Sequence, residues 1–115
     1  QYAYARIQSI LRENKNIKWD SKKTIKIFSK EKEILKQILI YPEVVKNAGD
    51  LYSPSLIANY TYDLVKLFNS FYQNINILGE KDTNLRSFRL LLSKKVGEII
   101  YNSFLLLGIN VPNRM

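Results

Sequence analysis

Apolar residues recur every three or four positions over two long stretches of this chain, and this spacing constrains the fold most strongly. Such a period places side chains along one face of an α-helix. The first long helix is predicted to start at Ser53-Pro54, a capping hydroxyl followed by proline at the first helical position, and to break at Leu78-Gly79. Asp82 or Thr83 caps the second, which ends at Gly108 and contains Gly97. The inward stripes are predicted to hold Leu56, Tyr60, Leu64, Leu67, Phe68, Phe71 and Ile75 in the first helix, and Leu85, Phe88, Leu92, Val96, Ile99, Ser103 and Leu106 in the second.

Shorter helical patterns precede these two. One runs from Tyr2 to about Arg12, with Ala3, Ile7, Ile10 and Leu11 at helical spacing. The next is predicted to begin with Ser29 as N-cap and to end at Tyr41-Pro42, because proline disfavours α geometry in the residue before it. A short helix from Glu43 to about Ala48, closed by Gly49, completes the set. The apolar face of the second pattern is predicted to consist of Ile34, Leu35, Ile38 and Leu39.

Alternating strand patterns are lacking, although Thr24 to Phe28 is the best candidate for a short extended piece. The predicted fold class is therefore all-α: an antiparallel bundle of about five helices, two of them long. At 115 residues the chain has room for one domain, which we place at 1–115. It begins with Gln1 and lacks an initiator Met and a signal-peptide pattern, which indicates a piece of a longer chain.

Composition narrows the function more by what is missing than by what is present. The chain has no cysteine and no histidine, which excludes disulfides, thiolate metal sites and the commonest general base. The glycines are isolated, so a phosphate-cradling loop is not predicted. No apolar run reaches the roughly 18 to 20 residues that span a bilayer. An enzyme active site within this chain is not expected, and binding is the favoured kind of function.

The net charge of +8 favours a polyanionic partner such as nucleic acid. An abundance of Lys, Asn and Ile produces the same excess without any binding role, so the charge alone leaves both interpretations open. The Lys-rich segment from 14 to 28, with Trp19 inside it, is either a solvated connection or a contact to RNA backbone. The solvated connection is the favoured interpretation.

Two groups of residues are candidates for binding an RNA base. Tyr2 and Arg6 are four residues apart and share a helix face beside the inward stripe, which sets an aromatic plate next to a guanidinium. Asn69 and Tyr72 also project together, and Asn69 is unfavourable in the middle of a helix. Single-stranded RNA loops are recognised through such ring faces and polar groups. The alternative is that these tyrosines line a helical core and that Asn69 faces water or a buried carbonyl.

Ordered motifs along the chain resemble one known family. Residues 1–12, Tyr41 to Val45, the Phe-Asn-x-Phe-Tyr signature at 68–72, the last helix and the ending Val-Pro-Asn-Arg-Met are similar to the C-terminal anticodon-binding (DALR) domain of class I arginyl-tRNA synthetases. The resemblance covers nearly the whole chain, but not 14–28. Ser55 stands where the family usually has His, and Asn113 where it usually has Glu.

The resemblance implies a role for particular residues. In this family the domain holds the anticodon loop and places the central cytosine in a pocket between the first helix, the Phe-Tyr helix and the C-terminal methionine. The resemblance therefore implies that tRNA-Arg is the partner. The residues it implies for binding are Tyr2, Arg6, Asn69, Phe71, Tyr72, Arg114 and Met115.

The resemblance also implies that the longer synthetase is a cytoplasmic monomer that ligates arginine to tRNA using ATP with Mg. Its His-x-Gly-His and Lys-Met-Ser-Lys signatures are absent here, so this chain is expected to carry tRNA recognition and no catalysis, no metal and no cofactor. The catalytic domain of the same protein would be its second partner. The alternative function is a helical protein–protein interaction domain.

Overall fold

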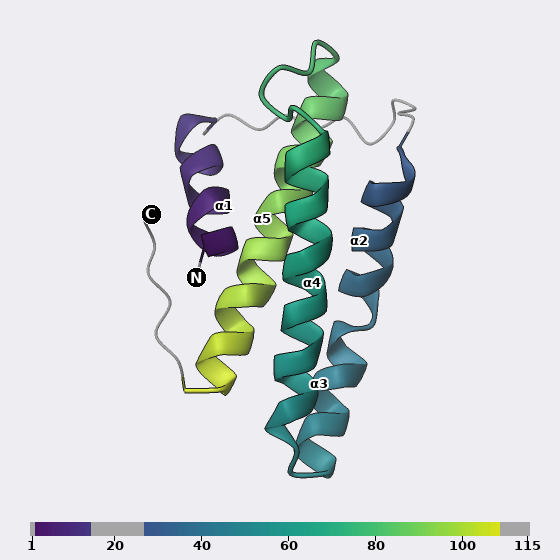
Figure 1. Ribbon diagram of the computed structural model, residues 1–115, viewed down its shortest axis with the longest axis vertical. Coiled ribbons are helices and arrows are strands. Elements are labelled where there is room, and N and C mark those ends of the chain that lie inside the picture. The colour runs from purple at the N-terminus through teal and green to yellow at the C-terminus, as the bar shows by residue number, and fades with distance from the viewer. Residues whose placement is uncertain (1, 15–26, 109–115) are drawn as a thin grey trace.

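The computed structural model describes residues 2–14 and 27–108, and this part of the chain forms five α-helices. They are α1 (Tyr2–Glu13), α2 (Ser29–Leu39), α3 (Tyr41–Asp50), α4 (Pro54–Asn74) and α5 (Thr83–Leu106). The two long helices, α4 and α5, run antiparallel through the centre, with α1 on one flank and α2 and α3 on the other (Figure 1). The prediction of an all-α bundle with two long helices is confirmed. Most of the extended piece expected at Thr24 to Phe28 lies outside the described residues.

The core lies where the apolar faces of α4 and α5 meet. Phe68 and Phe71 of α4 are fully buried, and so are Val96 and Ile100 of α5. The predicted stripe of α4 is shifted by one residue at its start, where Ile57 is buried and Leu56 only half-buried. Burying these side chains stabilises the bundle through removal of apolar surface from water.

Helix α1 packs closely against α5 because Gly97 has no side chain. A Cβ built on Gly97 would lie 3.0 Å from Cγ2 of Ile7, closer than carbon atoms normally approach. Ile7 and Ala3 are fully buried in this contact, and Ser93 lies one helical turn before Gly97 and is also fully buried. Glycine inside a helix costs about 1 kcal/mol relative to alanine. This cost is offset because glycine at this position lets α1 pack closely against α5.

Both ends of α5 agree with the sequence prediction, whereas the start of α2 differs from it. The Asp82 carboxylate accepts hydrogen bonds from the backbone N–H groups of Asn84 and Leu85, so Asp82 is the N-cap of α5. Gly108 follows the helix with φ +74°, the left-handed conformation that favours glycine. The prediction of Ser29 as N-cap of α2 is wrong, because Ser29 is already helical. The Phe28 N–H instead donates to the Glu31 carboxylate at 2.9 Å.

Three further expectations about α2, α3 and α5 are corrected by the structure. Helix α3 begins at Tyr41 and continues through Gly49 to Asp50, so glycine does not close it. Leu39 was expected on an inward face but is 77% exposed at the end of α2. Leu106, at the last turn of α5, is 51% exposed. Both leucines lie at helix ends, where the periodic stripe runs past the neighbouring helices of the described part of the chain.

A buried ion-pair network joins the start of α2 to α5. Nε of Arg89 donates to the Glu31 carboxylate at 3.0 Å, and its NH1 nitrogen donates to Glu80 at 3.1 Å. The side chains of Arg89 and Glu31 are 3% and 0% exposed. The Phe28 ring lies beside this guanidinium, 5.8 Å from Cζ to its centroid. The network thus ties α2, α5 and the connection between α4 and α5 together.

The short turn between α3 and α4 contains an exposed aromatic residue in an unusual conformation. Tyr52 has φ 52° and is 93% exposed. A left-handed backbone costs an L-residue roughly 1–2 kcal/mol. Nothing in its burial compensates for that strain.

Replacing Arg89 by methionine tests the buried network. The variant keeps an unbranched apolar side chain but leaves the Glu31 carboxylate buried without its cation, so the free energy of unfolding should fall by about 3–5 kcal/mol. Urea unfolding followed by circular dichroism measures this loss. The double variant with Glu31→Gln should be more stable than Arg89→Met alone, since the unpaired charge is gone. Lys46→Ala, which removes the exposed pair with Asp50, should cost less than about 1 kcal/mol.

Candidate nucleic-acid interface

The guanidinium of Arg6 lies between two tyrosine rings from separate helices. Its Cζ is 4.2 Å from the ring centroid of Tyr2 on α1 and 4.8 Å from that of Tyr72 on α4. Both distances fall within the range of cation–π attraction. Tyr2 is 58% exposed and Tyr72 37% exposed, so each ring remains partly accessible to a ligand. Helical spacing predicted that Tyr2 and Arg6 share a face, and the fold adds Tyr72 to that pair.

A hollow of about 240 Å³ opens beside these three side chains. Arg6 and Glu13 bring opposite charges to it, while the tyrosine rings and Leu78 supply apolar surface. Flat apolar faces next to a guanidinium suit a nucleobase that has a phosphate nearby. The residues that line this first hollow are Tyr2, Arg6, Ser9, Ile10, Glu13, Tyr72 and Leu78.

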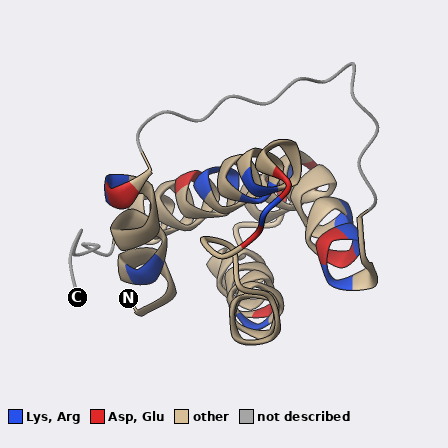
Figure 2. Ribbon diagram, turned by 90° about the horizontal axis from the view of Figure 1, so that it is seen from above, with Lys and Arg blue, Asp and Glu red and all other residues tan. Residues whose placement is uncertain are grey.

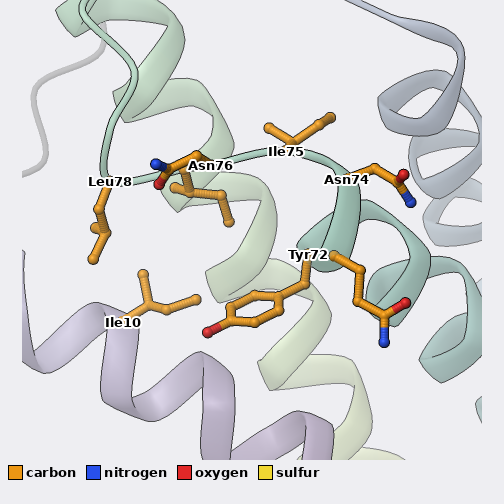
Figure 3. Close-up of a pocket in the computed structure, with 8 residues that line it drawn as sticks. Ile10, Tyr72, Asn74, Ile75, Asn76 and Leu78 are labelled. Carbon is orange, nitrogen blue, oxygen red and sulfur yellow. The ribbon is translucent and has the colours of Figure 1, made fainter.

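A second hollow of about 390 Å³ adjoins the first. Tyr72, Ile10 and Leu78 line both, so the two form one groove between α1, the end of α4 and the connection that follows it. Figure 3 shows Tyr72 directed from α4 toward Ile10 of α1, with Leu78 and Asn76 across from them. The remaining residues that line the second hollow are Gln73, Asn74, Ile75 and Ile77.

The other predicted site residues differ in where they lie. Phe71 is fully buried in the core, so it supports the helix beneath Tyr72 and has no surface to offer a ligand in this structure. Asn69 is half-buried, and its side-chain oxygen lacks a hydrogen-bond donor within the described part of the chain. A buried acceptor without a donor is costly unless a ligand supplies one. Arg114 and Met115 lie outside the described residues.

Four residues that line the first hollow were not among those predicted from sequence. Ser9 and Glu13 continue the helical spacing of Tyr2 and Arg6, so extending that face by two turns would have found them. Ile10 was assigned to the inward stripe, and it does both, because a buried side chain can form the floor of a groove. Leu78 was predicted only as a helix break, and no sequence pattern indicates that it reaches α1.

Charge does not mark this surface by itself. Figure 2 shows Lys and Arg interspersed with Asp and Glu along the helices in that view, without a face of a single sign. The Lys-rich segment predicted at 14–28 lies largely outside the described residues. The aromatic–guanidinium arrangement is therefore the feature that sets the groove apart.

Among residues 2–14 and 27–108, no group of three His, Cys, Asp or Glu side chains is placed to hold a metal ion. In the same residues, no helix combines the length and the apolar character needed to cross a membrane.

Solved structures share this arrangement of helices. The arginyl-tRNA synthetase of Thermus thermophilus matches 99% of this chain with a TM-score of 0.86 and 27% identity, over 20% of its own length. A putative arginyl-tRNA synthetase from Campylobacter jejuni has the same fold, with a TM-score of 0.80 over 99% of this chain and 25% of its own. The fold is that of the helical anticodon-binding domains of aminoacyl-tRNA synthetases.

Sequence comparison gives the family. The sequence pattern of the family described as the DALR anticodon binding domain matches residues 1–115. The chain belongs to that family, in the form found in arginine–tRNA ligases. Arginine–tRNA ligase of Flavobacterium psychrophilum is 56% identical over 100% of this chain, and that of Parabacteroides distasonis is 45% identical. The chain spans about a fifth of the length of these relatives, 19% and 20%.

Gly97→Ala tests whether close packing of α1 sets the position of Arg6. The added methyl meets the buried Ile7, so overpacking of about 1–3 kcal/mol should outweigh the gain in helix propensity. The variant should be less stable in urea, and the ring-current shift of the Arg6 side-chain NMR signals should shrink. Gly49→Ala is the matched control, because a Cβ at Gly49 meets no atom within 4 Å. This substitution should stabilise α3 by up to about 1 kcal/mol through the higher helix propensity of alanine.

Proposed function

We propose that this chain is the C-terminal anticodon-binding domain of a cytoplasmic arginine–tRNA ligase and binds the anticodon loop of tRNA-Arg. Membership of the DALR family and the names of the relatives support this proposal. Ligation of arginine with ATP and Mg then belongs to the catalytic domain of a longer, monomeric protein, in which residues 1–115 form one domain. The chain itself supplies tRNA recognition.

The observation that carries the proposal is the position of Arg6 between the rings of Tyr2 and Tyr72. A base splayed out of the anticodon loop would stack on one of these rings. The guanidinium beside it would hydrogen-bond the base edge or pair with a neighbouring phosphate. Because the guanidinium occupies the space between the two rings, the base would stack on a ring face that the guanidinium does not cover.

The remaining predicted residues complete this site in the proposal. The side-chain oxygen of Asn69 is buried and Asn69 lines neither hollow, so its assignment to RNA binding rests on the family resemblance. Phe71 acts through the packing of α4 under Tyr72. Arg114 and Met115 stay assigned to RNA binding by the family resemblance alone.

A protein–protein contact is the second candidate function. It is favoured by a groove of about 370 Å³ between α1 and α5, on whose rim Tyr101 and Leu105 are 44% and 56% exposed. A tight dimer in size-exclusion chromatography, together with indifference to RNA, would support this function over tRNA binding.

Tyr72→Ala tests the proposed function in the full-length ligase. Loss of one stacked base should weaken binding of tRNA-Arg by about 1–3 kcal/mol, roughly 5- to 150-fold. An electrophoretic mobility shift at low salt measures the dissociation constant. Tyr62→Ala is the matched control, because Tyr62 is an exposed tyrosine of α4 that contacts Lys66 and lines neither hollow. Equal binding by both variants would contradict a role for the Arg6 site in tRNA recognition.

A further inference from the structure

The end of α5 exposes apolar side chains on a stripe that is polar further up the helix. The outward-facing residues in the middle of α5 are Lys94, Lys95 and Glu98. Spacings of three and four residues continue this stripe to Tyr101 and Leu105, and both are exposed. Single exposed apolar residues are ordinary, but a group that begins where the charged residues stop indicates a surface that binds another protein segment.

This apolar group forms the rim of the groove of about 370 Å³ between α1 and α5, called the α1–α5 groove below. Tyr4 of α1 stacks on Tyr101, with the ring centroids 6.0 Å apart and the planes at 29°. Tyr4 and Gln8 line this groove, whereas Tyr2 and Arg6 line the first hollow. Figure 1 shows the start of α1 beside the later turns of α5. Helix α1 therefore turns one face to the candidate RNA site and another to the α1–α5 groove.

The polar groups of the α1–α5 groove favour a cation. Of the described residues that line it, Glu98 is the one that carries a charge. Asn102 donates its amide N–H to the Tyr41 hydroxyl at 2.8 Å, which leaves the Asn102 side-chain oxygen as an acceptor. A carboxylate, an amide oxygen and the exposed part of a tyrosine ring together suit a guanidinium or an ammonium group. The groove thus matches a protein segment that combines apolar side chains with an Arg or a Lys.

We propose that the preceding part of the longer ligase docks in the α1–α5 groove and places an Arg or Lys side chain beside Glu98. The inference rests on the proposed function, in which residues 1–115 are the C-terminal domain. The chain spans 19% and 20% of the length of two relatives, so most of such a protein lies outside it. In a C-terminal domain the preceding part joins at Gln1, directly before α1, and Tyr4 of that first turn lines the groove. Contacts between domains of one chain are commonly of this mixed polar and apolar kind.

Docking at this groove gives α1 a second support. The helix already packs on α5 through Ile7 and Gly97. A segment bound against Tyr4 and Tyr101 holds α1 from one face, while Arg6 on another face stays available to RNA. The contact therefore fixes the candidate RNA site relative to the rest of the ligase.

Hydroxyl-radical footprinting of the full-length wild-type ligase, read out by mass spectrometry, tests whether the groove is covered. Tyr101 is compared with Tyr62 and Tyr52, so that the intrinsic reactivity of the side chain cancels. The exposed fractions within this chain are 44%, 64% and 93%, which alone account for a difference of about twofold. A docked segment excludes water, so Tyr101 should be modified at least about fivefold more slowly than both references. A smaller difference overturns the proposal.

Two further measurements identify what covers the groove. Protection of Tyr101 should persist when the ligase is diluted a hundredfold, roughly the range that separates intramolecular from weak intermolecular contacts. Protection that fades on dilution assigns the groove to a second copy of the chain. Protection that is lost when residues 109–115 are removed assigns it to the chain's own end. Either result overturns docking of the preceding part.

Glu98→Lys tests the cationic contact in the same footprinting assay. Reversing the charge sets two cations side by side, so modification of Tyr101 should rise at least about threefold. Glu33→Lys on α2 is the matched control, because Glu33 is exposed and lines neither this groove nor the two hollows. Equal modification of Tyr101 in both variants overturns the contact at Glu98.

The footprint is measured without RNA, so its outcome is separate from that of the proposed function. If Tyr101 is unprotected while Tyr72→Ala still weakens tRNA-Arg binding, docking fails and the proposed function stands. If Tyr72→Ala and Tyr62→Ala bind tRNA-Arg equally, the role of the Arg6 site fails whatever the state of Tyr101.

Discussion

The contact between Ile7 of α1 and Gly97 of α5 is the constraint on which the candidate site depends. A side chain at position 97 would meet the fully buried Ile7, so only glycine lets the two helices come this close. The neighbouring face of α1 carries Tyr2 and Arg6, and their distance from α4 depends on how deeply α1 packs. Packing in the core thus determines the geometry of an exposed surface, because a helix moves as a unit.

The connection between α4 and α5, which forms the wall of the groove opposite α1, is held by ion pairs instead of apolar packing. Arg89 is almost fully buried and pairs with both Glu31 and Glu80, which draws the α4–α5 connection toward the start of α2. Burying these charges costs desolvation energy, so the network is weak evidence for stability. Its physical consequence is orientation, since Glu80 follows closely after Leu78, which lines both hollows. The groove therefore has one wall fixed by close packing and another fixed by charge.

Periodicity in the sequence predicted the helices well because each apolar stripe is a local property of its helix. The capping carboxylate of Asp82 and the left-handed Gly108 were likewise local signals, and both are confirmed. Features that depend on contacts between residues distant in sequence were predicted less accurately. Glu31 turns back to the Phe28 N–H and also meets Arg89, 58 residues away, which displaced the expected cap at Ser29. For the site, spacing paired Tyr2 with Arg6, but only the tertiary fold brings Tyr72, Ile10 and Leu78 to them.

The turn between α3 and α4 contains a residue whose backbone is strained while its side chain is exposed. Tyr52 keeps a left-handed backbone although its ring is almost fully exposed. Glycine or asparagine adopts this conformation at lower cost, so replacing Tyr52 with either would relieve strain and leave the core untouched. The same turn lines neither hollow of the groove. It is accordingly the natural position for attaching a fluorophore or an affinity handle that leaves the groove undisturbed.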